Sequence, residues 1–175
     1  MSNVRTPAAG LTVVFAAVAA CAVAPQSHDR VRTSIEEIHM TQHASGPFQV
    51  KLTPQSLALD DDTGGAARAR LSIDKQFHGD LEAASRGEML SAAGSVKGSA
   101  GYVAIEKVTG TLAGRKGSFV LQHNATMTRG VPYLNIIVVP DSADGELTGL
   151  TGTMKIIIAP DGAHSYEFEY ALPGV

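Results

Sequence analysis

Three residues near the middle of the chain, Tyr102, Glu106 and His123, are of the types that proton-transfer chemistry uses. A histidine can act as an acid or a base near neutral pH, and a buried carboxylate can acquire a raised pKa and polarise a substrate. Glu106 and His123 lie about equally far from Ala113-Gly114, so a hairpin that turns there would bring them close together. These three are the candidate catalytic residues if the protein is an enzyme, which the sequence leaves open.

Alternation does not decide which face of the 101–109 segment is internal. Tyr102 and Glu106 fall on one face, while Val103 and Ile105 fall on the other, and both faces carry apolar neighbours. His123 shares its face with apolar residues. This pattern is also typical of a core histidine that hydrogen-bonds to a neighbouring strand.

Four further polar residues are candidates for contact with a bound ligand. Lys75 falls on the apolar face of its segment, where a buried ammonium needs a carboxylate partner. The alternative is that its aliphatic side chain extends along the surface and carries the ammonium to water. Asn135 sits in an apolar run and must be hydrogen-bonded if buried. Tyr166 lies on the apolar face of a strongly amphipathic segment, where packing in the core is the competing interpretation. Glu88 fits either face.

No metal or cofactor is expected. Asp141, Asp144 and Glu146 crowd one turn without the spacing of a calcium loop, and no phosphate loop, nucleophile elbow or cysteine–histidine pair is present. Against 14 basic residues there are 17 acidic ones, a net charge of -3, which argues against nucleic acid as a partner.

The segments that follow Gly46 predict an all-β domain. Apolar and polar residues alternate in eight runs, separated by Gly, Asp, Pro and Ser. The expected strands are 46–54, 67–78, 81–92, 101–112, 118–129, 133–140, 146–159 and 164–172. Short connections make neighbours antiparallel, and eight such strands favour a closed up-and-down barrel, which has no free edge.

The first residues differ from the rest. Arg5 is the only charge before an apolar run that is too short to span a membrane and ends at Cys21, the only cysteine. The pattern is that of a signal peptide and resembles the lipobox of bacterial lipoproteins, so Cys21 is a candidate lipidation site; simple cleavage and secretion is the alternative. The expected organisation is a signal peptide at 1–20, a flexible linker at 21–44 and a barrel at 45–175.

Several segments carry a resemblance to a known family. They are DKQFHGDLE (74–82), GEMLSA (87–92), GSAGYVAIE (98–106), GSFVLQH (117–123), VPDS (139–142) and GELTGL (145–150). They resemble the bacterial domain of unknown function family 3224. The resemblance implies a closed eight-stranded barrel similar to that of plant allene oxide cyclase.

An eight-stranded barrel has room for packed side chains or for one small ligand. The favoured function is an exported, lipid-anchored barrel that binds a small apolar or amphipathic molecule in its lumen. One alternative is an isomerase or cyclase that resembles allene oxide cyclase; another is a structural or protein-interaction domain with a filled barrel. A lumen closed throughout by Phe119, Met154, Tyr166 and Phe168 would exclude a ligand. An open cavity with two or more of Lys75, Glu88, Glu106 and His123 within reach of one another would favour an enzyme. A homo-oligomer through the apolar 133–139 segment is possible.

The lipid anchor is directly testable. Cys21→Ser removes the thiol that would be acylated, so we expect the variant to leave the membrane fraction in a detergent-phase partitioning assay. Partitioning identical to that of the unaltered chain would refute the anchor.

Overall fold

The structure is a computed structural model, and it describes residues 40–58 and 66–174. The expected signal peptide and Cys21 lie outside these residues. The described part of the chain contains strands and turns and no helix, hence no helix able to span a membrane. The strands are β1 (Gln42–Gln55), β2 (Ala67–Phe77), β3 (Leu81–Ala93), β4 (Ala100–Leu112), β5 (Arg115–Thr128), β6 (Val131–Val138), β7 (Asp144–Gly145), β8 (Thr151–Ile158) and β9 (His164–Ala171).

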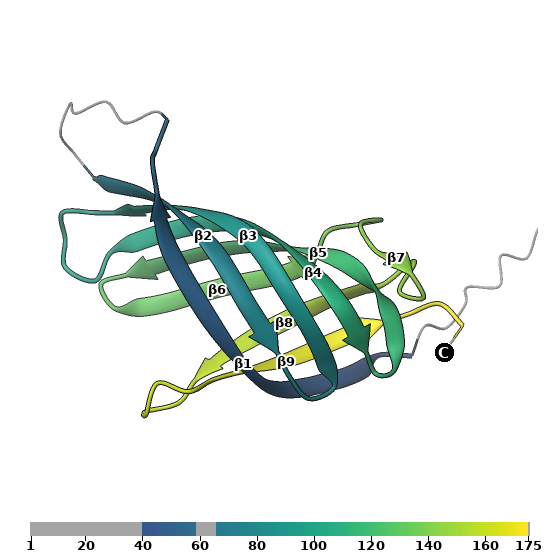
Figure 1. Cartoon of the computed structure of the whole chain (residues 1–175). Coiled ribbons are helices and arrows are strands. Elements are labelled where there is room, and N and C mark those ends of the chain that lie inside the picture. The colour runs from purple at the N-terminus through teal and green to yellow at the C-terminus, as the bar shows by residue number, and fades with distance from the viewer. Residues whose placement is uncertain (1–39, 59–65, 175) are drawn as a thin grey trace, which may run out of the picture. The chain divides into compact units, whose positions relative to one another are not determined.

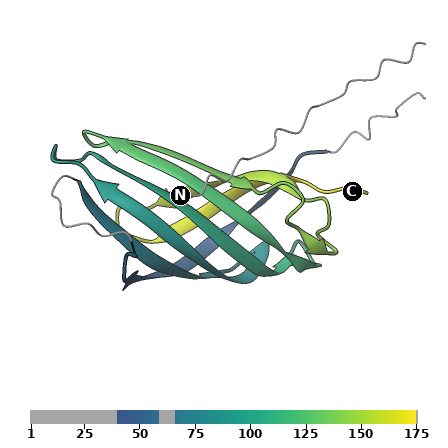
Figure 2. The ribbon, with the colours of Figure 1, turned by 90° about the horizontal axis from the view of Figure 1, so that it is seen from above.

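Eight long strands close into a barrel (Figure 1). Each pairs antiparallel with its neighbour along the chain. β6 pairs with β8, β9 returns to β1, and the β4–β5 pairing completes the ring. The predicted eight-stranded up-and-down barrel is therefore confirmed. The strands cross the barrel at a slant (Figure 2), as closure of a sheet requires.

The β4–β5 hairpin turns more tightly than its glycines suggest. Ala113 and Gly114 form the whole turn, with φ of 47° and 84°, the left-handed pair that matches the twist of two-residue hairpins. Gly110 and Gly117 lie opposite each other inside the strands. A Cβ at Gly110 would lie 2.3 Å from the carbonyl oxygen of Glu82, so this glycine permits close approach of β3 rather than chain reversal.

The connection from β6 to β8 closes one end of the barrel. The strand expected at 146–159 begins later, at Thr151, because turns occupy the residues before it. β7 pairs with the start of β5, and Asp144 accepts hydrogen bonds from the backbone and hydroxyl of Ser118. Leu147 and Leu150 are thereby buried in the core, and each is 1 % exposed.

β1 begins inside the stretch that was expected to be linker. Gln42, His43 and Ala44 pair with β9, and Ala44 is 2 % exposed. Pairing with β9 gives these residues the hydrogen-bonded partners that their polar sequence does not reveal.

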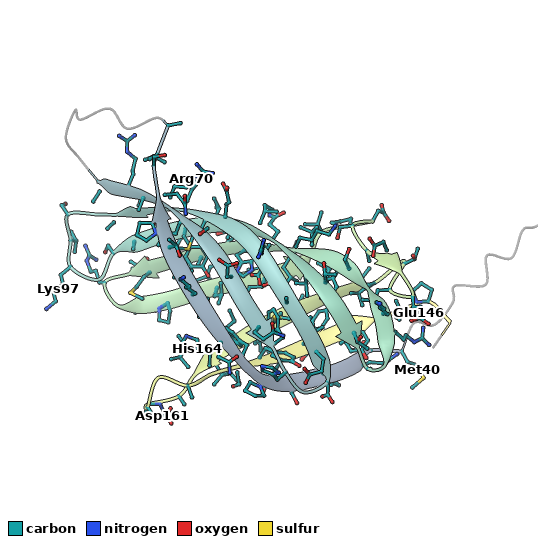
Figure 3. All side chains as sticks on the ribbon, viewed as in Figure 1. Met40, Arg70, Lys97, Glu146, Asp161 and His164 are labelled. Carbon is teal, nitrogen blue, oxygen red and sulfur yellow. The ribbon has the colours of Figure 1, made fainter. Side chains whose placement is uncertain are left out.

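The hydrophobic core fills only one half of the barrel, the half nearer β7. Met40 and Glu146 mark this closed end in Figure 3, whereas Lys97 and Asp161 mark the other, open end. The large buried side chains of the closed half include Phe77, Leu81, Leu112, Phe119, Leu121, Leu147, Leu150, Tyr166 and Phe168. Phe119 and Phe168 stack with ring centroids 5.8 Å apart. The residues expected to fill the lumen, Phe119, Met154, Tyr166 and Phe168, all pack in this closed half. They leave the open half of the lumen unfilled.

Candidate ligand-binding site

A cavity of about 490 Å³ occupies the open half of the barrel. Its wall is built by residues of β1 to β6, β8 and β9, most of them apolar. The lining residues are Phe48, Val50, Leu52, Ile73, Lys75, Met89, Ser91, Ala100, Gly101, Tyr102, His123, Ala125, Thr126, Met127, Pro132, Tyr133, Leu134, Ile156, Ile158 and His164. This volume is within the range of small-molecule sites, roughly 300–1,000 Å³.

The wall changes character with depth. Near the floor the lining residues are buried: Phe48, Ile73, His123 and Ala125 are each no more than 8 % exposed. Toward the mouth the lining is apolar but open to solvent, with Leu52, Met127, Tyr133, Leu134 and Ile158 all exposed. An exposed apolar rim that continues into a buried apolar wall is a surface that excludes charged solutes and favours apolar ones.

A polar cluster centred on Glu106, which is 0 % exposed, lies directly behind the floor of the cavity, to which it contributes Lys75 and His123. Its Oε2 accepts a hydrogen bond of 2.7 Å from Nζ of Lys75 and lies 3.1 Å from Nε2 of His123. Its Oε1 accepts a hydrogen bond from the hydroxyl of Ser85. The prediction that the hairpin brings Glu106 and His123 together is confirmed, and the 101–109 face left open by alternation is internal on the Glu106 side.

The register of four consecutive strands builds this cluster. Lys75 on β2 lies directly opposite Ser85 on β3, while Glu106 on β4 lies opposite Gly87, two residues further along β3. His123 on β5 is offset by the same amount from the partner of Glu106, Leu121. The four side chains therefore run diagonally across the sheet, where long side chains on one face still meet.

Ser85 and Gly87 are site residues that the sequence did not indicate by type. A Cβ at Gly87 would lie 3.0 Å from the Cβ of Glu106 and 2.3 Å from the carbonyl oxygen of Ile105. Glycine is therefore needed where β3 passes the buried carboxylate. The one available signal was the run of small residues at alternate positions, Ala83, Ser85 and Gly87, which leaves space for a large group from another strand.

The carboxylate of Glu106 stays ionised despite its burial. Burial raises its pKa, but the contact with His123, the charge and hydrogen bond of Lys75 and the hydroxyl of Ser85 together outweigh burial and lower the pKa to about 2. Nε2 of His123 is buried beside Oε2 of Glu106, and the described structure gives this nitrogen no hydrogen bond of good geometry.

Tyr102 joins the cluster from the side. Its ring centroid lies 6.4 Å from that of His123, and it lines the cavity. Burial, followed by the negative charge of Glu106, raises the pKa of the Tyr102 phenol. The hydroxyl therefore remains protonated and able to donate a hydrogen bond.

Three of the expected ligand contacts are not in the cavity. Glu88 points outward, with a side chain 59 % exposed, and holds Arg70 in a 2.5 Å ion pair, because Gly87 rather than Glu88 shares the internal face of β3. Asn135 is exposed opposite Asn124, since Ile136 takes the internal position on β6. The hydroxyl of Tyr166 accepts from the backbone of Leu81 and donates to the carbonyl of His78, so this residue closes the packed end.

A second hollow lies against the outer faces of β2 to β5. Exposed apolar side chains of Leu90, Val103 and Ile105 line it, beside the Arg70–Glu88 pair. The Arg70–Glu88 pair beside it is exposed, unlike the buried Lys75–Glu106 pair next to the lumen. Within the described ranges no group of three or more His, Cys, Asp or Glu side chains is arranged to hold a metal ion.

Loss of the Glu106 charge should destabilise the barrel strongly. Glu106→Gln leaves the ammonium of Lys75 buried without its counter-ion, which typically costs about 3–5 kcal/mol in the free energy of unfolding. Glu88→Gln on the exposed pair of the same sheet is the matched control, and we expect it to change stability little. Chemical denaturation at neutral pH measures both, and equal effects would contradict the role assigned to the cluster.

The same cluster predicts an acid-sensitive stability. The pKa of Glu106 is lower in the folded state than its ordinary value of 4.5, so its stabilising contribution is complete above pH 4.5 and is lost as the pH falls toward 2. Unfolding followed across this interval should show a steeper loss of stability in the unaltered protein than in Glu106→Gln. Parallel pH profiles would show that Glu106 titrates normally.

Comparison with known proteins identifies the family of this chain. A family model described as "Protein of unknown function (DUF3224)" matches residues 44–170. The crystal structure of a protein of unknown function from the DUF3224 family of Shewanella oneidensis MR-1 is similar, with 52 % sequence identity and a TM-score of 0.73 over 78 % of this chain and 100 % of that one. No curated protein matches this chain. The family model that matches most of the chain and the 52 % identity to a solved member show that the chain belongs to the DUF3224 family.

Proposed function

We propose that the protein binds a small apolar or amphipathic molecule in the lumen of its barrel. The observation that carries the proposal is the division of the lumen, with one half packed and the other a cavity of about 490 Å³ with an apolar wall. A domain with a purely structural role would gain from filling this space, because unfilled apolar volume lowers stability. The cavity therefore favours binding over the filled-barrel alternative.

The polar floor supports the same function. Lys75 and His123 line the bottom of the cavity while the wall above them is largely apolar. Ligand sites typically combine such a wall with a few placed polar groups, which orient the ligand. An amphipathic molecule would lie with its polar end at the floor and its apolar part against the wall.

We also propose that the barrel works outside the cytoplasm, held to a membrane by a lipid on Cys21. The support is the charge-free apolar run before Cys21. A barrel on a tether at a membrane surface would meet apolar molecules at high local concentration.

Filling the cavity should abolish binding. Ala125 lines the cavity and is 8 % exposed, so Ala125→Phe places a ring in the space that a ligand needs. We expect the neutral fluorophore N-phenyl-1-naphthylamine to bind the unaltered protein with one-to-one stoichiometry and to lose at least about tenfold in affinity with the variant, since a filled pocket removes the apolar contact area.

Ala84→Phe is the matched control for this experiment. Ala84 faces outward on β3, so the same substitution adds a ring to the surface and leaves the lumen unchanged. Binding that survives Ala125→Phe, or that Ala84→Phe weakens equally, would place the fluorophore outside the lumen.

A second function is favoured by one observation. Lys75, Glu106 and His123 meet within hydrogen-bond reach beside an open cavity, which is the arrangement expected of an enzyme such as an isomerase. Glu106 itself is sealed from the cavity and would position His123 and Lys75 rather than touch a substrate. His123 would take the proton from a carbon next to a carbonyl, and Lys75 and Tyr102 would stabilise the electron pair that moves onto the carbonyl oxygen.

Deuterium exchange separates catalysis from binding. If His123 acts as a base, undecan-2-one incubated with the protein in deuterated water should gain deuterium next to its carbonyl faster than in buffer, as mass spectrometry detects. His123→Gln should remove this excess while retaining the fluorophore. Exchange no faster than in buffer would leave binding as the function.

A further inference from the structure

The groups that the floor presents to a ligand are chiefly hydrogen-bond donors. Both oxygens of Glu106 are already engaged, and this residue is fully buried behind the floor. The ammonium of Lys75 has three N–H groups, of which one is bonded within the described part of the chain, to Glu106. The protonated phenol of Tyr102 adds a further donor at the cavity surface.

Lys75 is also held in position before any ligand arrives. Its Nζ lies 5.4 Å from the ring centroid of Phe48 and 5.6 Å from that of Phe77. Cation–π contacts with two rings and the ion pair with Glu106 fix the ammonium. A preorganised donor costs little ordering entropy when a ligand binds to it.

The charge of the floor is balanced. The charge of Lys75 is balanced by Glu106 behind it, and among the described residues the other titratable side chains that line the cavity are His123, His164 and the phenols of Tyr102 and Tyr133. A negative headgroup would add an uncompensated charge to an apolar enclosure, which is costly. A positive headgroup would lie against the ammonium of Lys75. An uncharged headgroup that accepts hydrogen bonds incurs neither penalty.

Resting on the proposed function, we infer that the ligand is an uncharged amphiphile whose carbonyl group accepts hydrogen bonds from Lys75 and Tyr102 at the cavity floor. Its apolar part extends along the wall toward the exposed rim of Leu52, Met127 and Leu134. The site therefore selects on two properties, an acceptor oxygen and the absence of charge.

Three compounds with the same nine-carbon tail test these properties. Undecan-2-one has the carbonyl, 2-methylundec-1-ene replaces its oxygen by a methylene group, and decanoate adds a negative charge. Each is used at pH 8 to displace N-phenyl-1-naphthylamine from the unaltered protein. We expect the ketone to bind at least about tenfold more tightly than the alkene, because hydrogen bonds to a charged donor are among the stronger ones, and more tightly than decanoate.

The double variant Lys75→Met/Glu106→Gln removes the donor without leaving a buried charge unpaired, so it should fold where either single variant is at risk. It should retain the fluorophore and lose most of its preference for the ketone over the alkene, while Tyr102 still donates one hydrogen bond to the ketone. Arg70→Met/Glu88→Gln makes the corresponding changes in the exposed ion pair on the same two strands, and should keep the preference for the ketone.

The outcomes separate this inference from the proposed function. An alkene that displaces the fluorophore as well as the ketone does, or decanoate that displaces it better, would overturn the inference while leaving binding in the lumen intact. A preference for the ketone that is as large in Lys75→Met/Glu106→Gln as in the unaltered protein would also overturn it. A fluorophore that does not bind the unaltered protein would overturn the proposed function itself.

Discussion

A single buried carboxylate links half of the barrel wall. Glu106 is 0 % exposed and receives Lys75 from β2, Ser85 from β3 and His123 from β5, so the burial of one charge couples four consecutive strands. Taking a carboxylate and an ammonium out of water costs several kcal/mol per ion, and only good geometry offsets this cost. The register of these strands and the glycine at position 87 provide that geometry, which is why the arrangement tolerates little change in either.

The same cluster divides the lumen. On the side of β7, aromatic and aliphatic side chains pack to near completion. On the other side, the layer that carries Lys75 and His123 is polar, and the wall beyond it encloses the cavity. A cluster at this level serves two purposes, since it caps the hydrophobic core and presents fixed polar groups to whatever enters the cavity. The proposed binding and the stability of the barrel thus depend on one set of residues, as is common where function requires polar groups in an apolar interior.

The local pattern predicted most of the fold. Alternation and short connections indicated eight antiparallel strands, and these exist at nearly the expected positions. The departures arise where a partner elsewhere in the chain decides the conformation. β1 begins at Gln42 because β9 pairs with it, and the residues before Thr151 turn because Leu147 and Leu150 fold inward to close the barrel. For the site, Glu106, His123, Tyr102 and Lys75 were identifiable by type, whereas Ser85 and Gly87 were not.

The sequence by itself determined which segments are strands, which neighbours pair and that Glu106 and His123 meet across one hairpin, because these properties depend on residues close together in the chain. Only the tertiary structure decided which face of β4 is internal. Val103 and Ile105 are apolar yet 54 % exposed, while Glu106 on the opposite face is buried. An alternation with a period of two residues indicates only that the two faces of a strand differ. The register of β2, β3 and β4 brings Lys75 and Ser85 to Glu106, and closure of the barrel places the face that carries them on the inside.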